Sequence, residues 1–276
     1  MIGMLKAEHV SVKYGDLTIV DDLSFRLEEG QWLMLVGPNG AGKSTMVEAI
    51  SQGAPYSGNI FLRGKNIRAY KPGQLARMVG VLAQKNAVGY DYSVEEVVGL
   101  GRYAYTSSFL SNRDDDGKAQ VERALELAGL TGLRHASVLT LSGGELQRTF
   151  LAQVFAQNPQ VLILDEPANH LDLIYQKHIF SLVKDWLRQP GRAVLSVVHD
   201  LSLARRYGTH ALLLHGGKCI AQGRMREVLT PENLDKVYGM DVYKWMRELL
   251  GQWDGGEENG ENPGKSAGNE PKESDW

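Results

Sequence analysis

A glycine-rich loop is the first stretch of this chain whose residue types and spacing could do chemistry. It has the spacing Gly-x-x-x-x-Gly-Lys-Ser and consists of Gly37, Pro38, Asn39, Gly40, Ala41, Gly42, Lys43 and Ser44. Glycines let backbone N–H groups turn toward phosphate oxygens, and a helix that follows adds positive potential. Lys43 would reach the β and γ phosphates, Ser44 would ligate Mg²⁺ and Thr45 would donate to the α-phosphate. The loop predicts a bound nucleoside triphosphate with Mg²⁺; the alternative is a glycine-rich turn without a ligand.

Two acidic residues, Asp165 and Glu166, directly follow the apolar run 161–164. Such a run is typical of a strand inside a parallel sheet, and ligands bind where the carboxyl ends of these strands meet. We expect Asp165 to hold the Mg²⁺ shell through water and Glu166 to polarise a water molecule for attack on the γ-phosphate. The alternative is an acidic turn that faces solvent.

Gln84 and His199 also stand at the ends of apolar runs, 79–83 and 194–198. A neutral amide can ligate a metal ion and orient water without adding charge, and an imidazole can donate to the γ-phosphate. The alternatives are an ordinary loop glutamine and a histidine that caps the next helix. The predicted catalytic residues are Lys43, Gln84, Glu166 and His199, and the predicted Mg²⁺ ligands are Ser44, Gln84 and Asp165.

Hydrophobic periodicity predicts the elements that must position these residues. Alternation over the first thirty residues indicates half-buried strands with a turn at 15–16. Continuous apolar runs predict strands, and amphipathic runs predict helices. The strands are expected at 32–36, 161–164, 193–198 and 211–214, and the helices at 43–52, 174–188 and 201–207. This order indicates an α/β core.

The pattern of strands and helices, together with the composition of the last residues, divides the chain into three parts. Residues 1–88 and 141–250 are predicted to form the nucleotide-binding α/β core with its N-terminal antiparallel β region. Residues 89–140 are predicted to form a helical insert, in which 122–129 is amphipathic and ends at a glycine. Residues 251–276 are polar, acidic and rich in glycine, so we expect a disordered tail that cannot bury enough apolar surface to fold.

Bulk properties limit the compartment and the partners. The chain has 276 residues with a formal net charge of −3, which gives no support for nucleic-acid binding. No apolar run approaches the roughly 18 residues that span a bilayer, and the N-terminus lacks a secretory signal. We therefore expect a cytosolic chain, and any membrane role would have to come through a partner. Cys219 is the only cysteine, and its strand-like surroundings predict a buried thiol.

The segment Leu141, Ser142, Gly143, Gly144 and Glu145, between the glycine-rich loop and the acidic strand, narrows the class further. With the other motifs it resembles the ATP-binding subunit of ABC transporters, over roughly residues 4 to 250. The glycine-rich loop resembles that family's Walker A, 141–145 its signature, 161–166 its Walker B and 167–172 its D-loop. Gln84 corresponds to the Q-loop and His199 to the switch histidine, while Tyr14 falls where the family stacks an aromatic ring on adenine.

This resemblance implies a P-loop NTPase (RecA-like) core with an antiparallel β subdomain and an inserted α-helical subdomain, which hydrolyses ATP with Mg²⁺. In this family the signature faces the glycine-rich loop of a second subunit, so Ser142, Gly143, Gly144 and Glu145 are expected to contact the ATP of a neighbouring copy. The implied partners are a second ATPase subunit in a homodimer or pseudo-dimer, two transmembrane permease subunits and, indirectly, a solute-binding protein. No nucleic acid is implied. The implied location is the cytoplasmic face of the cell membrane.

Three stretches, 146–148, 169–172 and 237–242, resemble the subunits of metal–chelate importers. We therefore expect uptake of an iron–siderophore, haem or cobalamin. The alternatives are an ABC exporter subunit and a soluble ABC ATPase without a transporter, which usually has two cassettes or a long coiled coil. The insert is expected to meet the membrane partners, and residues 102–105 offer aromatic and cationic groups for that surface, although one tyrosine could equally belong to the core.

Overall fold

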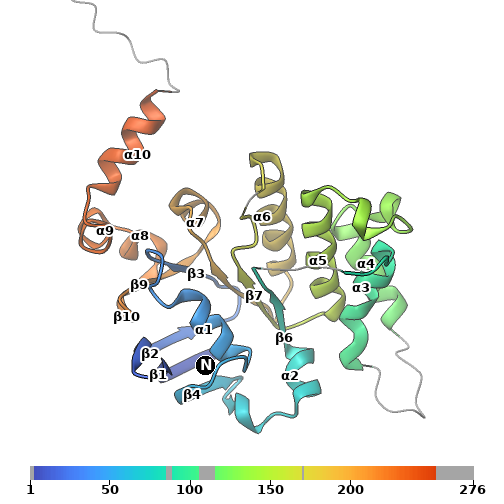
Figure 1. The fold of residues 1–276 in the computed structure, drawn as a ribbon, viewed down its shortest axis with the longest axis horizontal. Coiled ribbons are helices and arrows are strands. Elements are labelled where there is room, and N and C mark those ends of the chain that lie inside the picture. The colour runs from blue at the N-terminus through green and yellow to red at the C-terminus, as the bar shows by residue number, and fades with distance from the viewer. Residues whose placement is uncertain (1–2, 85–88, 106–115, 170, 253–276) are drawn as a thin grey trace, which may run out of the picture.

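Two sheets and the helices around them make up the part of the chain that the computed structural model describes, residues 3–84, 89–105, 116–169 and 171–252 (Figure 1). One sheet has four strands in the order β2-β1-β4-β5, and the other has six in the order β10-β9-β3-β8-β7-β6. The strands are β1 (Leu5–Tyr14), β2 (Leu17–Leu27), β3 (Trp32–Val36), β4 (Ser57–Leu62), β5 (Lys65–Asn66), β6 (Val79–Leu82), β7 (Val161–Asp165), β8 (Ala193–Val197), β9 (His210–His215) and β10 (Lys218–Arg224).

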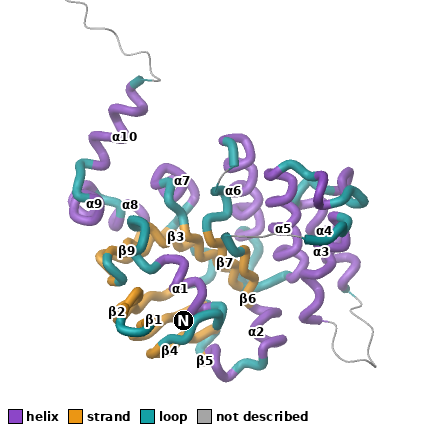
Figure 2. Tube along the Cα trace, viewed as in Figure 1, coloured by secondary structure: helices purple, strands orange, loops and turns teal. Residues whose placement is uncertain are grey.

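Helices surround the larger sheet and form a separate group at one side of it (Figure 2). The α-helices are α1 (Lys43–Ile50), α2 (Pro72–Met78), α3 (Val94–Gly99), α4 (Gly117–Leu127), α5 (Gly143–Gln157), α6 (Leu173–Leu187), α7 (Leu201–Tyr207), α8 (Met225–Val228), α9 (Pro231–Tyr238) and α10 (Val242–Gly251). Short 3₁₀ turns are η1 (Ile67–Ala69), η2 (Leu100–Tyr105), η3 (Thr131–Leu133) and η4 (Val138–Thr140). Within these described ranges, no helix is both long enough and apolar enough to span a membrane.

The six-stranded sheet confirms the predicted α/β fold. Strands β6, β7, β8, β3 and β9 run parallel, and only the edge strand β10 is antiparallel to its neighbour. Every residue of β3, β7 and β8 is buried, as expected for continuous apolar strands covered on both faces. The structure confirms the predicted strands, which correspond to β3 (32–36), β7 (161–164), β8 (193–198) and β9 (211–214). It also confirms the predicted helices at 43–52, 174–188 and 201–207, which correspond to α1, α6 and α7.

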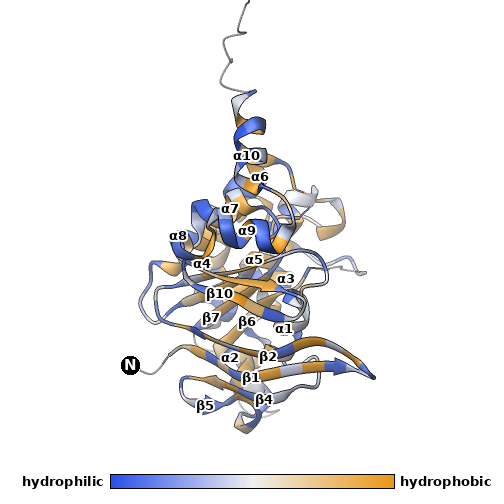
Figure 3. Cartoon of the chain, turned by 90° about the vertical axis from the view of Figure 1, so that its left-hand side faces the viewer, coloured by the Kyte–Doolittle hydropathy of each residue, from blue (hydrophilic) through white to orange (hydrophobic). Residues whose placement is uncertain are grey.

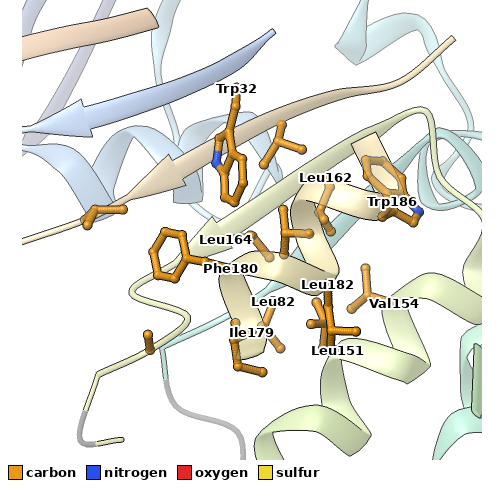
Figure 4. Packing of buried hydrophobic residues seen from close by; sticks show 14 of the residues in the cluster. Trp32, Leu82, Leu151, Val154, Leu162, Leu164, Ile179, Phe180, Leu182 and Trp186 are labelled. Carbon is orange, nitrogen blue, oxygen red and sulfur yellow. The ribbon is translucent and has the colours of Figure 1, made fainter. Parts of the chain in front are cut away.

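The two faces of this sheet have different covers. On one face Trp32 of β3 stacks on Phe180 of α6 with ring centroids 5.6 Å apart (Figure 4). The ring centroid of Phe180 also lies 4.9 Å from that of Tyr207 of α7. The indole N–H of Trp32 donates to the Ser196 hydroxyl of β8 at 2.8 Å. On the other face α1 packs between the two sheets, with Met46 fully buried. These contacts fix α1, α6 and α7 relative to the strand ends that precede them.

The N-terminal β region forms as the alternation predicts. Strands β1 and β2 pair antiparallel around the turn at 15–16, and Val10, Val12 and Leu23 point into the core. Tyr14, on the same strand face near the turn, is 49% exposed. The hairpin therefore buries its central residues and leaves its tip at the surface.

The helical insert packs against α5. Helices α3 and α4 both contact α5, which itself contacts β6, so α5 joins the insert to the sheet. The predicted helix at 122–129 is confirmed as the end of α4, and Gly129 follows it with φ +64°. The boundaries 1–88, 89–140 and 141–250 stay a proposal, and the predicted tail lies, from residue 253 on, outside the described residues.

Two expectations about single side chains are corrected. Cys219 is exposed, not buried, because β10 is an edge strand and none of its residues is fully covered. Arg102 is buried and donates to the Ala156 carbonyl oxygen at 3.0 Å. It therefore packs η2 against α5 and does not offer its charge to a partner. Tyr105 donates to the Gln157 carbonyl oxygen, whereas Tyr103 is 80% exposed.

Candidate functional site

Four adjacent strands bring the predicted chemical residues to one edge of the sheet. In the order β3-β8-β7-β6, their carboxyl ends carry the glycine-rich loop, His199, Glu166 and Gln84. Ligands of open α/β sheets bind at this edge. The residues surround a cavity of about 640 Å³. Its lining is Ile19, Asn39, Gly40, Gly42, Lys43, Ser44, Thr45, Gln84, Glu166, Asn169 and His199.

The glycine-rich loop wraps around a buried lysine. Lys43 is 5% exposed, and its ammonium donates to the carbonyl oxygens of Gly37 at 2.8 Å and Pro38 at 2.9 Å. Burial lowers the pKa of Lys43, and the nearby charges of Glu166 and Asp165 oppose that shift. Gly42 has φ +93°, and a Cβ there would lie 2.8 Å from the Ile19 carbonyl oxygen, so only glycine fits. A cation and the first N–H groups of α1 thus face the cavity, an arrangement suited to phosphate.

Ser44 and Asp165 form a small oxygen cluster beside the lysine. The Ser44 hydroxyl donates to Asp165 Oδ1 at 3.1 Å, and Asp165 is 8% exposed. Burial raises the pKa of Asp165, against the opposing effect of the Ser44 hydrogen bond. A hydroxyl and a carboxylate are the hard oxygen donors that Mg²⁺ accepts. Since the described residues contain no group of three or more His, Cys, Asp or Glu suited to a metal, water and phosphate oxygens would complete such a shell.

Three side chains hold both oxygens of the Glu166 carboxylate. His199 Nε2 lies 2.5 Å from Oε1, while the amides of Gln84 and Asn169 donate to Oε2 at 2.7 and 2.8 Å. Glu166 itself has φ +52°, a left-handed conformation that costs a non-glycine residue on the order of 1 kcal/mol or more. Such strain at a strand end aims the carboxylate, which can accept a proton from water, into the cavity.

Two residues at this site were not among the predicted site residues. Asn169 follows Glu166 in a tight turn, in which its N–H donates to the Glu166 carbonyl oxygen at 3.2 Å. Tyr238 of α9 is half-buried, and its hydroxyl is in hydrogen-bond contact with the backbone of Gly37; burial raises its pKa. The motif spacing offered a signal for Asn169, which lies three residues after the acidic pair. No local pattern links Tyr238 to a loop two hundred residues earlier.

The signature residues lie away from this cavity. Ser142 caps α5, its N–H and hydroxyl donate to Glu145 Oε2 at 2.9 and 2.7 Å, and these bonds lower the pKa of Glu145. A Cβ on Gly144 would lie 2.5 Å from the Tyr175 ring, so glycine permits α5 to meet α6. A Cβ on Gly143 would meet nothing within 4 Å. The exposed N-terminus of α5 can therefore be approached closely by another molecule.

The structure thus gathers only part of the predicted set around one cavity. Six predicted chemical residues line the cavity: Lys43, Ser44, Thr45, Gln84, Glu166 and His199. Asp165 does not line it but contacts Ser44, which does. Neither the signature residues nor Tyr14 is among the lining residues, and the Tyr14 hydroxyl donates to Glu48 Oε2 at 3.2 Å. Within the chain, Gln147 of α5 donates to the Pro167 carbonyl oxygen at 2.9 Å. This bond links α5, the helix that begins at the signature residues, to the turn after Glu166.

A phosphate loop, a neighbouring carboxylate pair and a histidine on one parallel sheet define a P-loop nucleotide hydrolase. Comparison with known proteins makes the assignment specific. A family model described as "ABC transporter" matches residues 20–169. The chain is 36% identical over 240 residues to the "Ferric enterobactin transport ATP-binding protein FepC" of Escherichia coli (strain K12), covering 87% of this chain and 88% of that protein. It is 40% identical over 246 residues to the "Hemin import ATP-binding protein HmuV" of Bordetella avium (strain 197N), covering 86% and 93%.

A solved bacterial Atm1-family ABC exporter with ATP bound has the same fold, with a TM-score of 0.70 and 26% identity over 88% of this chain and 41% of that one. The chain therefore belongs to the ATP-binding subunits of ABC transporters. It binds ATP and is an ATPase coupled to transport, which confirms the family, fold and activity predicted from the motifs.

Proposed function

We propose that the chain drives the import of an iron chelate, either a siderophore complex or haem, or of cobalamin, from the cytoplasmic face of the membrane. It would act with two permease subunits and, indirectly, a solute-binding protein. The proposed cargo rests on the similarity, over 87% of the chain, to a protein named for ferric enterobactin transport, together with the similarity to the hemin import relative. An exporter has the same fold, so the direction of transport rests on these relatives.

The cavity side chains suggest how ATP would be held. Lys43 would contact the β and γ phosphates, and the loop N–H groups and Thr45 would contact the remaining phosphate oxygens. Tyr14 lies outside the cavity lining, and the family resemblance alone suggests that it would stack on adenine. Ser44, Asp165 and Gln84 fit Mg²⁺, which would neutralise charge on the β and γ phosphates. The support for this assignment is the hydroxyl–carboxylate pair next to the buried lysine.

Glu166 would accept a proton from the attacking water through a carboxylate already aimed at the cavity. His199 would donate from Nε2 to a γ-phosphate oxygen and hold the water in place. The site is completed by Ser142 and Gly143 of a second copy, whose exposed position at the start of α5 supports a shared site. One chain then contributes two half-sites, and ATP is clamped between two copies.

Asn169→Ala tests whether the Glu166 carboxylate needs its second amide donor. We expect turnover to fall about tenfold with little change in the Kd for ATP, because Gln84 still holds Oε2 while one hydrogen bond to a charged group is lost. Steady-state hydrolysis and nucleotide titration measure the two quantities. Asn59→Ala, an amide on β4 remote from the cavity, is the matched control. Unchanged turnover in Asn169→Ala would show that Asn169 does not position Glu166.

The proposed cargo is tested by uptake in cells that lack this chain. Restoring the chain should restore accumulation of a labelled ferric siderophore, haem or cobalamin, and Lys43→Ala should not, because the phosphate contact is lost. Lys65→Ala, at an exposed site on β5, should restore uptake fully. Normal accumulation of all three solutes in the deficient cells, with reduced efflux of another solute, would favour the exporter.

A further inference from the structure

A second hollow lies outside the nucleotide site, where α7, β10 and α8 meet. Its volume is about 730 Å³, and three arginines line it, Arg205, Arg224 and Arg226, with Glu227 the only acidic residue among its lining side chains. All four side chains belong to exposed residues. We call this site the arginine hollow.

The cations of the arginine hollow lack acidic partners. Within the described ranges none of the three arginines forms an ion pair, and Arg205 instead donates to the Tyr243 hydroxyl of α10 at 2.5 Å. Glu227 accepts a hydrogen bond from the backbone N–H of Arg224 at 3.2 Å. Three guanidinium groups around one hollow therefore offer many N–H donors to an anion.

Helix dipoles account for two of these arginines and leave Arg224 unexplained. Arg205 lies in the last turn of α7, where a cation is favourable. Arg226 lies in the last turn of the four-residue α8, where a cation is also favourable, whereas Arg224 is the N-cap of α8, where a cation is unfavourable. The position of Arg224 is explained better by an anionic ligand than by the stability of the helix beside it.

The chain itself carries an acidic segment after α10, the helix that begins at this hollow. Residues 253–276 contain seven acidic and two basic residues, a net charge of −5. They follow α10, whose first turn is held at the hollow by the contact between Tyr243 and Arg205 and whose remainder projects from the body (Figure 3). A segment of 24 residues spans up to roughly 79 Å when extended, whereas α10 is about 15 Å long. The segment is therefore long enough to return to the hollow.

We infer that the acidic segment 253–276 docks in the arginine hollow of its own chain, with its carboxylates accepting hydrogen bonds from Arg205, Arg224 and Arg226. Tethering gives the segment an effective concentration in the millimolar range, an advantage over any free anion of similar affinity. The contact is electrostatic and lies at the surface. Salt weakens it, since the screening length falls from about 30 Å at 0.01 M to about 3 Å at 1 M.

The test uses the full chain and two spin labels, one on Cys219 and one on Ser266→Cys. Cys219 is the only cysteine, is exposed, and lies about 17 Å along β10 from Arg224. At low salt we expect a narrow distribution of short distances. In Arg224→Gln/Arg226→Gln the ratio of docked to undocked chains should fall at least about tenfold, the size of one lost charge-assisted hydrogen bond. High salt should have the same effect.

Arg188→Gln, which removes an exposed arginine of α6's C-cap, is the matched control and should leave the distribution unchanged. ATP binding verifies that each variant is folded, because neither Arg224 nor Arg226 lines the nucleotide cavity. A broad distance distribution at low salt in the doubly labelled chain with all three arginines intact overturns the inference. So does a distribution that is insensitive to Arg224→Gln/Arg226→Gln.

Anionic phospholipid vesicles and duplex DNA are the competing occupants. If the segment occupies the hollow, replacing its seven acidic residues by amides should broaden the distance distribution without any added anion. If vesicles or DNA instead bind through Arg224 and Arg226 with equal affinity whether or not the segment is neutralised, the hollow serves that partner and the inference is overturned.

Discussion

Glu166→Gln is expected to reduce ATP hydrolysis by about 10²- to 10⁴-fold while ATP still binds. The amide preserves the size of the side chain and its place beside His199, but it cannot accept the proton of the attacking water. The loss is of the size attributed to a general base. Steady-state turnover and ATP titration separate the two effects.

Glu248→Gln, on an exposed face of α10, is the matched control for the loss of one carboxylate and should turn over normally. The assignment of Glu166 as the base fails if Glu166→Gln hydrolyses ATP at nearly the rate of the unchanged chain. It fails equally if the variant loses ATP affinity in proportion to its rate, since the carboxylate would then act in binding.

Ser142→Arg has the second largest expected effect, a loss of turnover of about 10²-fold or more, the size seen when a single oxyanion donor is removed. Ser142 does not line the cavity of its own chain, so each subunit should keep its affinity for ATP. The arginine would instead block the approach of α5 to the nucleotide of a second copy. Hydrolysis and nucleotide binding by the same preparation test both halves of this expectation.

Loss of the helix cap has to be distinguished from that block. Ser142 caps α5 through a reciprocal pair of bonds with Glu145, and removing such a cap costs about 1 kcal/mol. Ser142→Ala loses the same cap and the same hydroxyl but adds no bulk, so thermal unfolding should show similar losses for both substitutions, while turnover should fall further in Ser142→Arg than in Ser142→Ala. Normal hydrolysis by Ser142→Arg would contradict the shared site.

The parts of the fold predicted from sequence are those that a local pattern specifies. The strands β3, β7 and β8 are continuous apolar runs, and burial on both faces of a parallel sheet demands such a composition. Because Glu166 directly follows β7 and His199 follows β8 after one residue, their convergence at one sheet edge followed from the predicted topology. The glycine-rich loop was equally readable, since its geometry depends on its own glycines.

What escaped prediction depends on contacts between distant segments. Tyr238 reaches the backbone of Gly37 only because α9 packs against the core, and no periodicity predicts that contact. The burial of Cys219 was predicted wrongly because a strand-like composition does not tell an edge strand from a central one. The roles of Tyr14 and Ser142 concern a nucleotide and a second copy, so they remain proposals.

The central claim is that each nucleotide site is shared by two copies of the chain. Its most direct test is the molar mass of Glu166→Gln in ATP and Mg²⁺, measured by light scattering after size exclusion. We expect a dimer, and we expect Glu166→Gln/Ser142→Arg to remain a monomer that still binds ATP. A dimer of the double variant, or an ATP-saturated monomer of Glu166→Gln, would contradict the claim.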